Sequence, residues 1–209
     1  MKQARTNSVD SIKAIAAILV VVQHALGSGE VMSLILTLAR VAVPLFMIIT
    51  GFFYSSVVKR KKQGKQIKKF VVIALTMTLI YFVLDFLTAV LKHDTVNFLS
   101  SMLSFDSVFR FVVFQDPVFA DHAWYMWSMI IVLALVWLIP IIYKNKILHY
   151  PIIIAGALST VIFGKYSIAF FGTDIPSFYT RTAWSVGFPY FLLESLLASI
   201  KKSLLKSVI

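Results

Sequence analysis

The chain alternates long apolar stretches with short polar segments. Six stretches approach the length of about 20 residues that an α-helix needs to cross the hydrocarbon core of a bilayer. They lie near Ile12–Leu26, Ser33–Val58, Phe70–Leu91, Ala123–Tyr143, Pro151–Phe171 and Ala183–Ile200. This pattern predicts an all-α fold: a polytopic transmembrane helix bundle of about six spans, in which residues 1–209 form a single domain.

Basic residues fall on alternate connections between these stretches. The strongest run extends from Lys59 to Lys69, and Lys144 and Lys146 lie in a second basic connection. Because cytoplasmic loops are enriched in Lys and Arg, both connections belong in the cytoplasm, and counting spans outward from them places both termini there too. The 92–122 loop on the opposite side is acidic. We therefore expect a multi-pass membrane protein with both termini cytoplasmic.

Composition strengthens the membrane assignment. Hydrophobic residues make up 59% of the chain and charged residues 14%, and the mean hydropathy is +0.87. A soluble domain has about 45–50% apolar and about 25% charged residues. A net charge of +11 would suggest nucleic acid in a soluble protein, but here the charge lies between apolar stretches, so we expect the lipid bilayer and no nucleic acid as partner. Cysteine is absent, which excludes a disulfide framework.

Ionisable residues inside the first stretch need a reason, since each costs roughly 2.5–3.5 kcal/mol to insert at the centre of a bilayer. Lys13 and His24 share one helical face and lie roughly 16 Å apart along the axis. Asp10 precedes Lys13 by one turn and can pair with it. In the simpler alternative, Lys13 extends its ammonium group to the cytoplasmic interface and His24 only packs against a backbone partner.

Further polar residues fall at the outer ends of later stretches. Together with His24 they are Arg40, Asp85, His122 and Arg181. Several ionisable groups at one depth predict a polar cavity in the outer half of the bundle. Trp124 and Tyr125 follow His122, although such aromatic residues have a simpler explanation as membrane-interface anchors.

Other features give less information about chemistry. Pro44 and Gly51 predict a kinked helix whose freed carbonyl groups face protein or a cavity. His93 and His149 fall in connecting loops and receive no role. No His, Asp or Glu residues have the spacing of a metal site, so we predict no bound metal. A serine-hydrolase elbow, a P-loop and a dinucleotide fingerprint are absent from the sequence.

Four segments of the chain form an ordered series. They are Asp10-Ser11-Ile12-Lys13 continuing to Val22-Gln23-His24, Arg40-Val41-Ala42-Val43-Pro44-Leu45-Phe46 with Ile49-Thr50-Gly51-Phe52-Phe53, His122-Ala123-Trp124-Tyr125, and Arg181 with Gly187-Phe188-Pro189-Tyr190-Phe191. In order and spacing they resemble the signatures of the membrane-bound acyltransferase 3 family across nearly the whole chain. They are also similar to the membrane domain of the vancomycin-resistance serine racemases.

The resemblance implies an enzyme of the bacterial cytoplasmic membrane that moves an acyl group, usually acetyl from acetyl-CoA. Typical acceptors are hydroxyl or amine groups of extracytoplasmic molecules, such as cell-wall or exported polysaccharide sugars. Acyl-CoA would be a co-substrate, and no bound cofactor is expected. The implied partners are the bilayer, acyl-CoA and an extracytoplasmic carbohydrate.

The resemblance also implies roles for individual residues. His24 would act as general base or as transient acyl carrier, because imidazole titrates near neutral pH. Arg40 would offset developing negative charge. Asp10 and Lys13 would hold the CoA end of the donor. The acceptor would meet His122, Trp124, Tyr125 and Arg181.

Two departures from the family pattern leave alternatives open. Lys13 stands where the family has Arg, which keeps the charge but loses the bidentate fork. Family members usually have about ten spans of about 20 residues each, so we expect a relative truncated to about six. The alternative functions are a non-enzymatic membrane protein, transporter-like or a partner subunit, and an inactive remnant of the family. An inverted repeat would support a transporter, and the sequence contains none.

Overall fold

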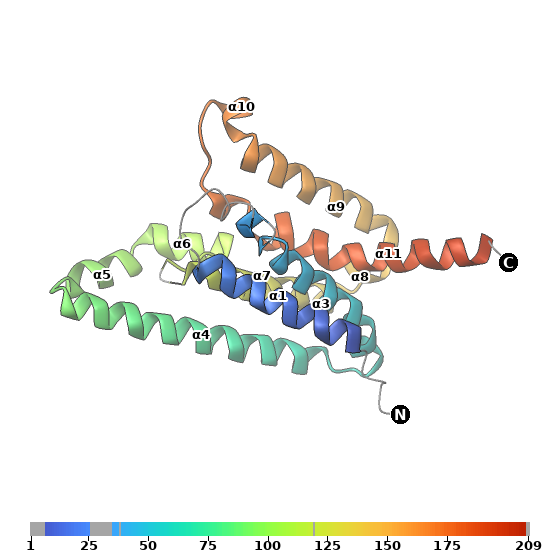
Figure 1. The fold of residues 1–209 in the computed structure, drawn as a ribbon, viewed down its shortest axis with the longest axis horizontal. Coiled ribbons are helices and arrows are strands. Elements are labelled where there is room, and N and C mark those ends of the chain that lie inside the picture. The colour runs from blue at the N-terminus through green and yellow to red at the C-terminus, as the bar shows by residue number, and fades with distance from the viewer. Residues whose placement is uncertain (1–6, 26–34, 38, 119, 208–209) are drawn as a thin grey trace.

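A computed structural model of the chain describes residues 7–25, 35–37, 39–118 and 120–207. These residues form helices joined by short turns, with no strand among them (Figure 1). The helices are α1 (Asn7–Ala25), α3 (Ala42–Lys59), α4 (Gln63–Leu91), α5 (Thr95–Met102), α6 (Phe105–Phe114), α7 (Trp124–Leu138), α8 (Ile141–Lys144), α9 (Lys146–Thr160), α10 (Ser167–Phe171) and α11 (Phe188–Ser207). Two short helical turns directly precede α7 and α11: the 3-10 turn η1 (Asp121–Ala123) and the π-helical turn η4 (Ala183–Gly187). The all-α fold is confirmed.

Three helices of the described chain are long and apolar enough to cross a membrane. They are Ile35–Lys59, Gln63–Leu91 and Lys146–Lys165. A fourth span results if α5 and α6, which meet at an angle of 47°, are taken together. α7 is apolar but shorter, at 15 residues. Length and composition therefore support a multi-pass membrane protein with three or four such spans, and the count of six stays a prediction.

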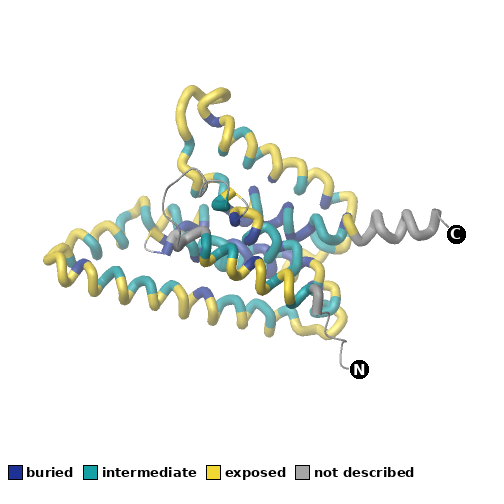
Figure 2. Tube along the Cα trace, viewed as in Figure 1, coloured by how far each residue is buried: buried dark blue, intermediate teal, exposed yellow. Residues whose placement is uncertain are grey.

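The most deeply buried part of the molecule is formed by α3, α7, η4 and α11 (Figure 2). Met47, Leu133 and Phe191 are fully buried there. The backbones of α3 and α11 approach closely at Gly51, where an added Cβ would overlap the carbonyl oxygen of Phe191. Small residues at such contacts are typical of helix pairs in membranes, because they let the backbones come close enough for dense packing.

The second apolar stretch is irregular, but not at Pro44 and Gly51, where the kink was predicted. α3 is one continuous helix, and the irregular backbone precedes it at Arg40 and Val41. Pro44 lies in the first turn of α3, where its missing N–H interrupts no helical hydrogen bond. Gly51 serves close packing instead of bending.

α4 forms a long flank beside this centre, and α5 and α6 fold back along its outer half (Figure 1). Leu75, Leu79 and Leu84 of α4 are all more than half exposed. In a membrane such side chains lie against lipid, so their exposure in the protein carries no penalty. The 92–122 segment, which we expected to be an acidic loop, is largely helical and contains α5, α6 and most of η1.

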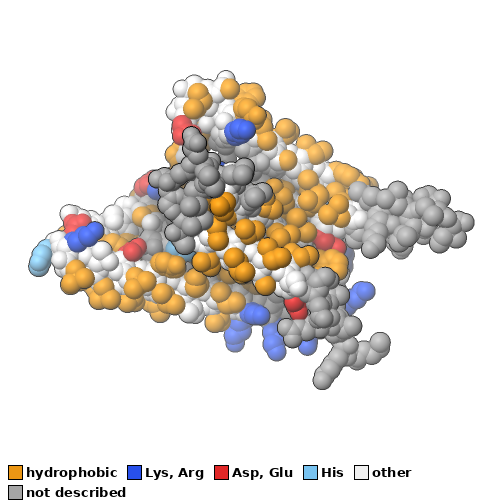
Figure 3. Space-filling view, viewed as in Figure 1, with side chains coloured by type: hydrophobic (Ala, Val, Ile, Leu, Met, Phe, Trp, Pro, Cys, Tyr) orange, Lys and Arg blue, Asp and Glu red, His pale blue; other side chains and the backbone are white. Residues whose placement is uncertain are grey.

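The basic segments lie at one end of the molecule. The turn from α3 to α4, the turn from α8 to α9 and the end of α11 are all found there (Figure 1). Lys and Arg side chains of the Lys59–Lys69 run are exposed and gather at that end (Figure 3). The placement of this basic end in the cytoplasm stays a prediction from the charge pattern.

Candidate functional site

The first group of site residues lies near the basic end of α1. Lys13 Nζ is 3.9 Å from Asp10 Oδ1, one turn earlier in the helix. The ammonium group also lies over the ring of Phe53 in α3, 4.7 Å from its centroid. The pair anticipated from the sequence is therefore present, and a cation–π contact worth about 0.5–1 kcal/mol joins it to α3.

The Lys13–Phe53 contact sets the register between α1 and α3, which pack together and run in opposite directions (Figure 1). His24 follows Lys13 by eleven residues, or roughly 16 Å along α1, and counting eleven residues back along α3 from Phe53 reaches Ala42, so we expect the backbone of His24 near the level of Ala42. The side chain of His24 lies outside the described side chains. Arg40 precedes Ala42 by two residues and is exposed. The backbones of His24 and Arg40 thus lie at a similar depth.

His122 approaches α4 near the middle of that helix, in the half away from the basic turns. It belongs to η1, is half-buried, and its ring meets the ring of Tyr81 edge-on, with the centroids 3.9 Å apart and the planes at 70°. Asp85 follows Tyr81 by one turn of α4, on the same face. Two of the predicted polar residues therefore lie near the same part of α4: Asp85 belongs to it, and His122 contacts it one turn earlier.

Trp124 and Tyr125 begin α7 directly after η1. Both are half-buried and pack against the central core. The ring of Tyr125 lies 6.2 Å from that of Phe46, one turn into α3. This contact connects the start of α7 with the start of α3, so the two aromatic residues are part of the packed bundle.

Arg181 is half-buried and directly precedes the turn into α11. That turn is held by a capping box, in which the Thr182 hydroxyl accepts the N–H of Ser185, and Ser185 Oγ accepts the N–H of Thr182. The N–H of Ala183 donates to Gln115 Oε1 at 2.9 Å. The position of Arg181 is thus fixed by the segment that follows α6.

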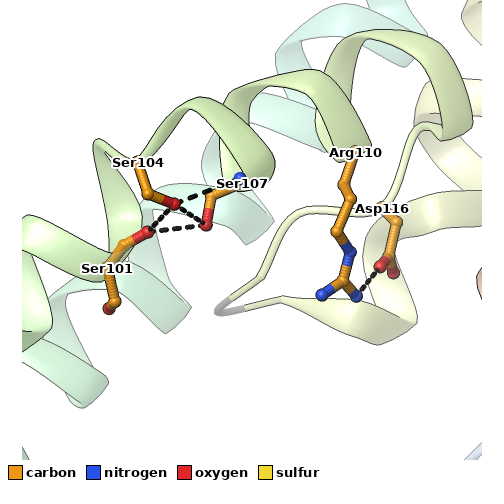
Figure 4. A network of polar contacts seen from close by, with 5 residues as sticks. All are labelled: Ser101, Ser104, Ser107, Arg110 and Asp116. Carbon is orange, nitrogen blue, oxygen red and sulfur yellow. Dashed lines mark hydrogen bonds and ion pairs between the residues drawn. The ribbon is translucent and has the colours of Figure 1, made fainter.

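Sequence reasoning missed a polar network at the end of α6. Arg110 forms an ion pair with Asp116, whose side chain is only 4% exposed (Figure 4). The Arg110 guanidinium also lies 4.2 Å from the ring centroid of Phe178. Gln115 between them has a left-handed backbone, with φ of 59°, which turns the chain after α6. This network ties α6 to the segment before η4.

The position of His149 differs from the one predicted from the sequence. It lies within α9 instead of a loop and is fully buried. Its Nε2 lies 3.0 Å from the carbonyl oxygen of Ile142, to which it donates, and Ser195 Oγ lies 2.5 Å from its Nδ1. The imidazole therefore joins the break before α9 to α11.

The site residues thus form two groups, one near the basic end and one near the opposite end. A half-exposed ammonium group at the first can bind an anionic donor, and the second offers imidazole and guanidinium groups for acid–base chemistry and charge stabilisation. No group of three His, Cys, Asp or Glu residues that could hold a metal ion occurs in the described part of the chain.

Comparison with known proteins identifies the family. A family model described as an acyltransferase domain, that of acyltransferase 3, matches residues 6–208, which is nearly the whole chain. No curated protein and no solved structure matches the chain. The match agrees with the ordered motifs at Asp10–His24, Arg40–Phe53, His122–Tyr125 and Arg181–Phe191. The chain therefore belongs to the acyltransferase 3 family of membrane-bound acyltransferases.

Proposed function

We propose that the protein is a membrane O-acyltransferase. It takes an acyl group, such as acetyl, from acyl-CoA at the cytoplasmic face and transfers it to a hydroxyl group of an extracytoplasmic acceptor, such as a cell-wall or exported polysaccharide sugar. The arrangement of α1 and α3 supports this proposal. Along α1, His24 lies roughly 16 Å from Lys13, and the register with α3 puts Arg40 near the depth of His24. A donor with a long flexible arm, such as the pantetheine arm of CoA, suits this separation.

The donor end of the site is available for phosphate binding. The Lys13–Asp10 contact of 3.9 Å is at the long limit of an ion pair, and both side chains are about two-fifths exposed. Exposed pairs of this kind contribute only about 0–1 kcal/mol, so a phosphate group of CoA can compete for the ammonium group. Asp10 then keeps the Lys13 side chain oriented when no donor is bound.

In the proposed reaction, His24 accepts the proton of the acceptor hydroxyl. The hydroxyl oxygen attacks the carbonyl carbon of the thioester, and Arg40 stabilises the negative charge that develops on the carbonyl oxygen. The C–S bond then breaks, and the CoA thiolate takes the proton back from His24. One imidazole therefore serves as base and then as acid, and no group is consumed.

The test is acyl transfer by His24→Ala in proteoliposomes, with radiolabelled acetyl-CoA on one side and a cell-wall polysaccharide acceptor on the other. Because loss of a general base costs about 10²–10⁴-fold in rate, we expect at least a 100-fold loss. Arg40→Leu should also abolish transfer, whereas His122→Ala should cost less than His24→Ala. Arg60, which is exposed in the turn after α3, provides the matched control for Arg40, and Arg60→Leu should keep its activity.

Each variant must insert and keep its helical content, which circular dichroism of the purified protein checks. If His24→Ala transfers acetyl at a near-normal rate, His24 is not the base, and His122 becomes the residue to test. If Arg40→Leu is fully active, Arg40 is only an interfacial anchor.

A further inference from the structure

A continuous stripe of α4 changes from apolar to polar along its length. Its residues recur every three or four positions, so they face the same side of the helix over about 25 Å. They are Leu75, Thr78, Leu79 and Phe82, followed by Asp85, Thr88, Ala89 and Lys92. The first part lies nearer the middle of α4 and the second part nearer its end at Leu91. This is the order of polarity that a lipid molecule has along its own length.

The apolar part of the stripe borders a cavity of about 380 Å³ between α4 and the α5–α6 pair. α6 contributes Ser107, Val108 and Phe111 to it, and α5 contributes Met102. The lining is almost wholly hydrocarbon and aromatic, and it offers no charged side chain. Such a cavity fits an acyl chain and excludes a sugar or a phosphate.

The polar part of the stripe borders a second cavity of about 450 Å³ between the end of α4 and α5. Its lining holds the carboxylates of Asp85 and Asp94, the ammonium of Lys92 and the amide of Asn97, with one aromatic face from Phe98. Asn97 Nδ2 donates to Asp94 Oδ1 at 2.5 Å, which holds both groups at the rim. Donors and acceptors beside an aromatic face are suited to a hydroxyl-rich group.

The two cavities are neighbours along the seam between α4 and the α5–α6 pair, and no residue lines both. Phe82 lines the apolar cavity and Phe98 the polar one, and their ring centroids are 6.0 Å apart. On the other side of the seam, Ser107 Oγ donates to the carbonyl of Ser101 at 2.6 Å, at the bend between α5 and α6 (Figure 4). A molecule with a chain and a polar head can lie across the Phe82–Phe98 contact, with its chain in the first cavity and its head in the second.

We propose that this seam binds the acceptor and that the acceptor is a glycolipid, with an acyl chain in the apolar cavity and an uncharged sugar in the polar cavity. The two carboxylates outnumber the single ammonium group, so an anionic headgroup is repelled. Tyr81, one turn from Asp85, contacts the His122 ring, which places a bound sugar beside the predicted acceptor residues. The proposal rests on the proposed acyl transfer, for which it supplies the substrate.

The test uses the full chain in phosphatidylcholine nanodiscs that contain a glucosyl-diacylglycerol with a photoactivatable diazirine in one acyl chain. After irradiation, mass spectrometry should locate crosslinks in residues 75–82 and in α6. Crosslinking by the glycolipid should exceed that by an equally labelled phosphatidylcholine about tenfold, equivalent to about 1.4 kcal/mol of preference, and excess unlabelled glucosyl-diacylglycerol should displace it. A diazirine-labelled phosphatidylcholine should label these residues weakly and should not be displaced by phosphatidylglycerol.

Two variants make the result specific. Leu79→Trp fills the apolar cavity and should abolish the crosslinks. Leu84→Trp is the matched control, because Leu84 is similarly exposed but lies five residues further, about 140° around α4, and it should keep them. The double variant Asp85→Ala with Asp94→Ala should lower glycolipid crosslinking about tenfold, to the level of phosphatidylcholine.

Equal labelling by both lipids, or crosslinks that survive Leu79→Trp, would overturn the glycolipid assignment. Crosslinking needs no catalysis, so it should persist in His24→Ala. A glycolipid that crosslinks but never receives an acyl group would refute the proposed function and leave the binding site standing. Acyl transfer to a soluble polysaccharide without any crosslinking would do the reverse.

Discussion

The centre formed by α3, α7, η4 and α11 and the flank formed by α4, α5 and α6 are built from the same apolar residue types. In the centre Leu133 and Leu192 are fully buried, whereas in the flank Leu79 and Leu84 are more than half exposed. Moving a leucine from lipid into protein gains little, since lipid tails are as apolar as the side chain. Hydrophobicity alone therefore does not decide which helices form the centre.

Close approach of helix backbones and hydrogen bonds between segments determine which helices form the centre. Gly51 lets α3 touch the backbone of α11, and Gly187 of η4 packs against Ser128 and Val132 of α7. The flank has a glycine only at Gly64, near the start of α4, where an added Cβ would be 3.6 Å from its nearest neighbour, the ring of Trp137. The contrast can be tested at several positions.

The largest expected effect is all-or-none and tests whether lipid covers the flank. The chain has no cysteine, so single-cysteine variants can be labelled without background. Ser100→Cys in α5 should react with a membrane-impermeant maleimide in intact cells, Gly64→Cys only after permeabilisation, and Leu84→Cys in neither case, because lipid surrounds it. Labelling of Gly64→Cys from outside would reverse the topology, and labelling of Leu84→Cys would place water against the flank.

The next largest effect compares two glycines. Gly51→Ala should lower the free energy of unfolding by about 3 kcal/mol, the upper end of the range for overpacking, because the new methyl group meets backbone that cannot move aside. Gly64→Ala should leave stability unchanged or raise it by up to about 1 kcal/mol, since alanine favours the helix. Reversible unfolding in mixed micelles measures both. Equal effects at the two sites would remove the distinction between centre and flank.

A smaller effect is expected at the link between the two regions. Asp116→Ala leaves Arg110 without its ion-pair partner and should cost about 2–3 kcal/mol of stability. Asp106 is an exposed acid in the first turn of the same helix, and Asp106→Ala should cost less than about 1 kcal/mol through the helix dipole. The same unfolding assay compares them, and an equal cost would mean that the ion pair adds nothing to the fold.

The smallest effect tests whether the stability gained from a leucine comes from its packing against protein or from its removal from water. Leu133→Ala in the centre should cost about 2 kcal/mol, the low end for buried leucines, because only the cavity part of the cost remains in a bilayer. Leu84→Ala in the flank should change stability by less than about 0.5 kcal/mol. A loss at Leu84 as large as at Leu133 would show that the flank is packed against protein.

Some of what the sequence analysis missed was present as a local signal. Apolar residues of α6 recur at Phe105, Val108, Phe109, Val112 and Val113, the spacing of an amphipathic helix. Ser104 directly precedes them, and its hydroxyl accepts the N–H of Ser107 as an N-cap. The acidic character of the whole 92–122 segment hid this pattern. The Asp10–Lys13 pair was predicted and α6 could have been, because each depends only on residues close together in the sequence.

Contacts between helices had no such signal. α4 is apolar on nearly every side, so hydropathy does not indicate which face turns towards α7. The bond between Ser195 and His149 and the bond between Ala183 and Gln115 depend on how the helices are rotated, which the sequence pattern leaves open. The depth of His24 relative to Arg40 follows from one cation–π contact that only the fold reveals.

The bond from the Ala183 N–H to Gln115 also has a consequence for biosynthesis. Its two residues are 68 positions apart, and at about 5–20 residues per second a ribosome needs about 3–14 s to add that length. The end of α6 leaves the ribosome well before the turn into α11 that will hold it. The contact between the end of α6 and the turn into α11 therefore forms late, and a nascent chain halted before residue 183 has its first helices without this contact.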